Sequence, residues 1–235
     1  KEILGLEYPV KEFEEKHRKS DLTSENLNEI FPALQELHNA LSQAEEKGVH
    51  PKLRDHAWSC LAEACALIAK NEGLLNNEEL IALVRSVLLG ASQNPEPLPS
   101  PEHDPQFDEH LSWGLPAARI QAAIGLIMLA RHPTLARPDV LEAIVRLSKD
   151  PVPAVRFQIV ANLTALYKTA RELMWQIIEL TCSEEQSRGV LQGLLGGGLR
   201  PLAHIEPDRV THLTKAIFDK VRDGPGANKV RGSCV

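Results

Sequence analysis

The sequence predicts an all-α fold of antiparallel helix pairs stacked as a solenoid, and three observations support this prediction. Of the 235 residues 43% are hydrophobic but only 4% are aromatic, and the helix-favouring residues Leu and Ala dominate. Apolar residues recur at three- and four-residue spacing, which is typical of helices with one buried face. Similar segments also return along the chain at a regular interval, as they do in stacked helical repeats.

The N-terminal part is predicted to hold a charged lead-in and the first helical repeats. Residues 1–23 are mostly charged, and we expect a solvated lead-in that includes at most a short helix. Residues 24–93 carry the first repeats. An apolar stripe from Leu27 to Leu41 predicts one amphipathic helix, which Pro32 is expected to kink or restart, and Pro51 opens the next.

Residues 94–110 break the helical pattern. Five prolines occur there among acidic residues and histidines, and they cannot share one helix or central strand. The segment is therefore predicted to be a long exposed loop, of a kind that is usually functional or disordered. The residues that we regard as a candidate interaction loop are His103, Asp104, Phe107, Asp108, His110 and Trp113.

Helices are predicted to resume over residues 111–223, and the tail 224–235 is predicted to be flexible. Prolines stand where a first helical turn would begin, a position that tolerates their missing N–H. Short linkers between the helices indicate antiparallel neighbours. The expected helices span 115–131, 138–148, 153–169, 171–181, 185–196 and 207–222.

Internal repetition is the strongest evidence for this arrangement. Three segments, each predicted to be a helix pair, have an arginine early in their first helix, namely Arg119, Arg156 and Arg188. These arginines are 37 and 32 residues apart (156 − 119 and 188 − 156). A weaker copy of the pattern contains Arg54. One such pair cannot bury its own apolar face, so neighbouring pairs are expected to stack.

Residues 147–166, LSKDPVPAVRFQIVANLTAL, strongly resemble the signature of the HEAT-repeat family. In that family an Asp closes one repeat and an Arg follows a Val at the start of the next, and these are Asp150, Val155 and Arg156 here. The resemblance implies a right-handed α-α superhelix in which each Asp reaches the Arg of a neighbouring repeat. We expect Asp150 and Arg156 to be structural and partly buried.

The other repeats depart from this signature. Trp113 and Cys182 stand six residues before Arg119 and Arg188, where the family has its Asp. The resemblance covers residues 51–222, and armadillo-type and other α-solenoids share its general pattern. The segment that begins DEHLSWGLPAARIQ is also similar to helical regions of large multidomain bacterial proteins, some of which are nucleotide-dependent machines of anti-phage defence.

The chemical motifs favour structural roles. Cys60 and Cys65 share one predicted helix with His56 at spacings that do not converge on a tetrahedral metal. Gly196-Gly197-Gly198 has neither the preceding strand nor the following Lys-Ser or Lys-Thr of a phosphate loop, so we interpret it as a helix C-cap and turn. We therefore predict no catalytic, cofactor-binding or metal-binding residue in this chain, and no enzyme activity.

Charge and cysteine content limit the partners and the compartment. The net charge of −6 argues against nucleic acid as the main partner. Sparse cysteines are typical of a reducing compartment, and neither a secretory signal nor an apolar run long enough for a membrane span is visible. These features predict a cytoplasmic protein without a membrane partner.

The leading functional hypothesis is a scaffold that binds another protein, or another domain of the same protein, along a repeat surface. One alternative is a sensor or regulatory arm whose catalytic domain lies outside these residues. Another is nucleic-acid binding through a C-terminal basic face made of Arg209, Lys215, Lys220, Arg222, Lys229 and Arg231.

Overall fold

The computed structural model describes residues 2–18, 22–102 and 104–221, and every regular element in these ranges is a helix. The all-α prediction is confirmed. No helix within the described ranges is long and apolar enough to cross a membrane. The chain divides into two compact units. Unit 1 comprises Lys1–Pro97 and Gly114–Leu129, and unit 2 comprises Leu98–Trp113 and Ala130–Val235.

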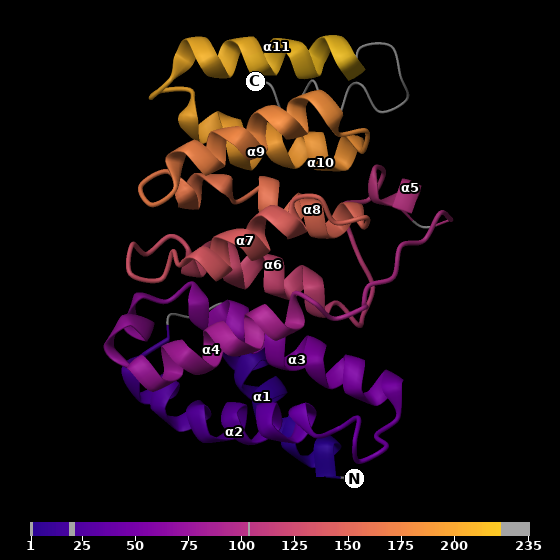
Figure 1. Cartoon of the computed structure of the whole chain (residues 1–235), viewed down its shortest axis with the longest axis vertical. Coiled ribbons are helices and arrows are strands. Elements are labelled where there is room, and N and C mark those ends of the chain that lie inside the picture. The colour runs from indigo at the N-terminus through magenta and orange to yellow at the C-terminus, as the bar shows by residue number, and fades with distance from the viewer. Residues whose placement is uncertain (1, 19–21, 103, 222–235) are drawn as a thin grey trace. The chain divides into compact units, whose positions relative to one another are not determined.

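Unit 1 is built around α3. Its elements are α1 (Glu2–His17), α2 (Ser24–Ser42), α3 (Pro51–Ala69), the 3-10 helix η1 (Glu72–Asn76), α4 (Glu78–Ala91) and α6 (Ala118–Leu129) (Figure 1). The central helix packs against α1, α2, α4 and α6. Buried alanines on α3, α4 and α6, with Trp58 beside them, allow these three helices to approach closely.

Helix α1 corrects the expectation of a solvated lead-in. Its side chains Ile3, Val10 and Phe13 are buried, so this helix belongs to the packed core. The apolar stripe is difficult to recognise in the sequence because Glu7 and Glu14 lie on the same buried face. The Glu7 carboxylate lies 2.6 Å from Nδ1 of His56 on α3, which gives this buried charge a partner.

The next helices begin at side-chain caps, and the first of them differs from the prediction at its proline. Helix α2 continues through Pro32, so the expected kink or restart does not end it. It begins after Thr23, whose side chain forms a capping box with Asn26. Helix α4 is capped by Asn77, whose side chain accepts a hydrogen bond from the N–H of Leu80 at 2.9 Å.

In the second half of unit 2, alternate helices pack on each other. The elements of unit 2 are α5 (Asp104–Phe107), α7 (Pro138–Leu147), α8 (Pro153–Val160), η2 (Leu163–Leu166), α9 (Arg171–Glu184), α10 (Arg188–Gly193), the π-helical η3 (Leu194–Leu199), η4 (Arg200–Leu202) and α11 (Pro207–Val221). Helix α10 packs on α8, and α11 packs on α9 (Figure 1).

The glycine run Gly196-Gly197-Gly198 is not the helix end that the sequence suggested. It continues α10 as the π-helical turn η3, and the glycines permit close packing against α8. A Cβ at Gly197 would lie 2.1 Å from the backbone oxygen of Ala161, and one at Gly193 would lie 2.6 Å from the Phe157 ring. Only glycine leaves room for this approach.

Candidate interaction site

Arg156 lies one turn into α8, and its guanidinium donates four hydrogen bonds. Nε and Nη2 donate to the two carboxylate oxygens of Glu185 at 2.7 and 2.9 Å. Nη1 donates to the carbonyls of Asp150 and Pro151 at 2.7 and 3.0 Å. The Arg156 and Glu185 side chains are 17% and 6% exposed. This two-pronged pair is therefore largely shielded from water, where charge-assisted hydrogen bonds are strong.

Glu185 connects α9 to α10 and was missed by the sequence analysis. Its Oε1 also accepts hydrogen bonds from the N–H groups of Gln186 and Ser187, at 2.9 and 2.7 Å. One carboxylate thus fixes the turn that leads into α10 and holds the guanidinium of α8. In the sequence Glu185 resembles a solvated residue beside Glu184. Its place just before the repeat arginine Arg188 is the signal that could have revealed it.

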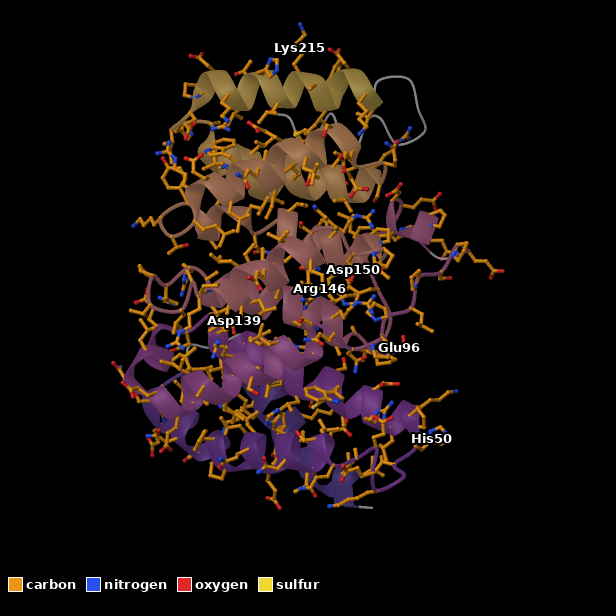
Figure 2. All side chains as sticks on the ribbon, viewed as in Figure 1. His50, Glu96, Asp139, Arg146, Asp150 and Lys215 are labelled. Atoms are coloured by element: carbon orange, nitrogen blue, oxygen red, sulfur yellow. The ribbon has the colours of Figure 1, made fainter. Side chains whose placement is uncertain are left out.

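Asp150 stabilises the turn before α8. Its carboxylate accepts a hydrogen bond from the N–H of Val152 at 2.9 Å, and the residue is 8% exposed (Figure 2). The hydrogen bond between Asp150 and Arg156 uses the backbone carbonyl of Asp150. The two signature residues are therefore close together, with Asp150 buried and Arg156 partly buried, and the carboxylate shown to pair with Arg156 is that of Glu185. Val155, the third signature residue, is fully buried in α8.

The other repeat arginines have different surroundings. Arg119 in unit 1 is 9% exposed and donates to the carbonyls of Asn94, Pro95 and Pro97 at 2.8, 2.6 and 2.7 Å. Like Arg156, it fixes a proline-containing stretch by binding backbone oxygens. Arg54 makes a 3.6 Å contact to Glu45, whose side chain is 90% exposed, and such a pair contributes little to stability. Arg188 is half-buried in the first turn of α10.

A surface pocket of about 400 Å³ opens beside the Arg156–Glu185 pair. It is lined by Ser148, Lys149, Asp150, Pro151, Arg156, Leu180, Thr181, Glu184, Glu185 and Gln186. The volume lies in the range of small-molecule sites. Arg156 already binds protein acceptors with four hydrogen bonds, however, so its guanidinium holds the junction between helices.

The predicted loop packs against α8 through Phe107. This ring is 5% exposed and meets the ring of Phe157 on α8 edge-on, with centroids 5.6 Å apart. Gly189 on α10 provides the space, because a Cβ there would lie 2.9 Å from both Phe107 and Leu111. Segments that are about fifty or more residues apart in the chain thus form one apolar contact. The prediction of a fully exposed loop is therefore wrong at Phe107, whose ring is buried.

Asp108 adds a polar contact to this docking. Its carboxylate accepts a hydrogen bond from the Ser187 hydroxyl at 2.6 Å and another from the N–H of Gly189 at 2.9 Å. Ser187 also caps α10 by accepting a hydrogen bond from the N–H of Val190. The aromatic contact and this carboxylate therefore hold the segment at neighbouring points on α8 and α10.

The remaining candidate loop residues have different positions. His103 lies outside the described residues, and for Asp104 the structure describes only its place at the start of α5. His110 is exposed, and Trp113 is 38% exposed. The proline-rich part that precedes α5 is also mostly exposed, with Leu98 at 61%. Phe107 and Asp108 thus serve to dock the segment, while its flanks face solvent.

Burial suppresses thiol reactivity at the described cysteines. Desolvation is the main cause that raises the pKa of Cys60 to about 12 and that of Cys182 to about 11. Burial also raises the pKa of Cys65. These thiols remain protonated at neutral pH, and the protonated form is a poor nucleophile. Cys234 lies outside the described residues.

The remaining observations concern metal binding and similarity to known proteins. Within residues 2–18, 22–102 and 104–221, no group of three or more His, Cys, Asp or Glu side chains is arranged to hold a metal ion. Comparison of the chain with protein-family models, with curated proteins and with solved structures found no match.

Proposed function

We propose that this chain is a protein-interaction module built from helical repeats, and that its binding surface is the face of unit 2 formed by α8 and α10. The observation that carries the proposal is the docked segment itself. Phe107, at the end of α5, and Asp108 after it show that this face holds a short segment of polypeptide with one aromatic anchor and one carboxylate. Interfaces commonly concentrate their binding energy in such aromatic anchors.

The packing within unit 2 supports a repeat architecture of the HEAT or armadillo kind. Helices α8 and α10 pack on each other, and so do α9 and α11, which follow them in the chain. The bond from Arg156 to Glu185 joins consecutive helix pairs, the role that the family resemblance assigns to an acid–arginine pair. In our proposal these pairs form part of a right-handed solenoid, which would present an extended surface to a partner chain.

The partner that we propose is another protein or another domain of the same polypeptide. The second possibility corresponds to a regulatory arm of a larger cytoplasmic protein, and the same surface would serve it. Nucleic acid is a weaker candidate, because Arg209 pairs with Glu179 and lies over the Trp175 ring, while Lys220 donates to the carbonyl of Ser183. The other predicted basic residues Arg222, Lys229 and Arg231 lie outside the described residues. Lys215 does point away from α11 into solvent (Figure 2).

Recovery of a partner by two glycine variants tests the proposed surface. Gly189→Val fills the space beneath Phe107, whereas Gly196→Ala is a matched control because its Cβ meets no atom within 4 Å. Tagged chains would be retrieved from the producing cells, and co-purified proteins quantified by mass spectrometry. We expect the recovered amount of one protein to fall at least about tenfold with Gly189→Val but not with the control. Equal recovery by two variants with parental circular dichroism would contradict the proposal.

A further inference from the structure

The docked segment points to the chemistry of the partner. We propose that residues 107–111 occupy the binding site of a partner segment, and that the partner binds by displacing them. The partner segment would contain an aromatic residue followed directly by an aspartate. This inference rests on the proposed interaction function and adds the recognition chemistry and a built-in competitor.

The site on α8 and α10 that binds this segment, called the seat below, has three parts. The ring of Phe157 on α8 contacts the aromatic residue, and Gly189 on α10 leaves space for that residue because it has no side chain. Ser187 and the N–H of Gly189 donate hydrogen bonds to one carboxylate oxygen of Asp108. An aromatic ring and the carboxylate after it can therefore bind together, and an aspartate is better placed than a neutral residue because charge strengthens both hydrogen bonds.

The segment can leave this seat without unfolding the helices beneath it. Phe107 is its buried anchor, while Pro105 and Gln106 before it and Glu109 and His110 after it are exposed. Ser187 keeps its own capping bond to Val190 when Asp108 is absent. Contacts of this size open locally at low free-energy cost, so the segment can exchange with a competing chain.

Occupancy by the chain's own segment lowers the apparent affinity for any competitor. The apparent dissociation constant equals the intrinsic dissociation constant divided by the fraction of chains whose seat is empty. A tethered occupant is present at a high effective concentration, so this factor can be large. Mutations that empty the seat should therefore increase the binding of a matching peptide.

The experiment uses a fluorescent peptide with the sequence of residues 104–113 and the full chain. Phe107→Ala combined with Asp108→Ala empties the seat, and fluorescence anisotropy measures peptide binding. We expect this variant to bind at least about tenfold more tightly than the parent. A peptide in which the Phe and the first Asp after it are alanine should not bind, and adding Gly189→Val to the emptied chain should abolish binding.

A second measurement needs no variant. Excess isotope-labelled peptide added to the parent should accelerate hydrogen exchange in the chain's own residues 104–111, because those residues leave the seat. The inference is overturned if the emptied chain, with a parental circular dichroism spectrum, binds the two peptides equally, or if excess peptide leaves exchange unchanged. Such a result combined with Gly189-dependent partner recovery would reject this recognition chemistry alone. Equal recovery of the partner by Gly189→Val and Gly196→Ala would reject the proposed function itself.

Discussion

At the scale of single residues, the Arg156–Glu185 pair is predicted to be a major contributor to the stability of unit 2. Arg156→Ala would leave the Glu185 carboxylate buried without its cation, and Glu185→Ala would do the converse. Each change should lower the free energy of unfolding by about 2–4 kcal/mol, because an unpaired buried charge is costly. Urea denaturation of both variants measures this loss.

Two comparisons sharpen this test. The double variant should lose less free energy of unfolding than the two single variants lose together, because the two residues share one interaction. Asp150→Ala removes the carboxylate that accepts a hydrogen bond from the N–H of Val152 and should cost about 1 kcal/mol. Parental stability of Arg156→Ala and Glu185→Ala, with a loss of partner binding, would show that the pair serves recognition and not stability.

Glu63 on α3 gives a prediction about pH. Burial is the main cause that raises the pKa of its carboxyl, and the nearby Glu14 charge raises it further, while Arg18 opposes both. The folded pKa therefore lies above the unfolded pKa, so ionisation of Glu63 above it costs stability and acidification restores that stability. Glu63→Gln should raise the melting temperature at neutral pH, and the difference from the parent should shrink as pH falls through this raised pKa. A difference that grows on acidification would refute this assignment.

At the scale of elements, the glycine-rich η3 turn is predicted to set the distance between α10 and α8. Gly197→Ala places a Cβ 2.1 Å from the Ala161 oxygen, and backbone atoms cannot move aside cheaply. The variant should lose about 1–3 kcal/mol of stability, as overpacked cores do. Thermal or urea unfolding would measure this loss.

The adjacent glycine is the control for this prediction. A Cβ at Gly196 meets no atom within 4 Å, so Gly196→Ala should be neutral or stabilise by about 0.5–1 kcal/mol through reduced backbone freedom. Equal losses at Gly196 and Gly197 would mean that helicity of the turn, and not close packing, determines the need for glycine.

The helices themselves were largely predictable, and the exceptions have physical reasons. Prolines at first turns located the starts of α7, α8 and α11 correctly, because the first turn of a helix favours proline. The packed helix α1 was missed because two glutamates interrupt its apolar stripe. The η3 turn was misread because three consecutive glycines are a common stop signal, and only the neighbouring helix explains their presence.

At the scale of the whole molecule, sequence patterns pointed to some residues of the candidate site but not to their partners. The signature led to Asp150 and Arg156, and the proline-rich segment led to Phe107 and Asp108. Neither pattern could identify Glu185 or Ser187 as their partners, because such pairs form only when distant segments fold together. Local patterns show which residues are unusual, whereas tertiary packing determines what they bind.

The central claim is that the face of unit 2 formed by α8 and α10 contacts another protein. A photo-crosslinking amino acid at Gln186, which is exposed and directly precedes Ser187 at the start of α10, tests it directly, with Ala216 on the exposed side of α11 as the matched position. We predict that Gln186 is crosslinked in cells to one defined protein, or to another part of the same polypeptide, and that Gly189→Val removes the product. Crosslinks that form only at Ala216, or that persist unchanged in Gly189→Val, would contradict the account.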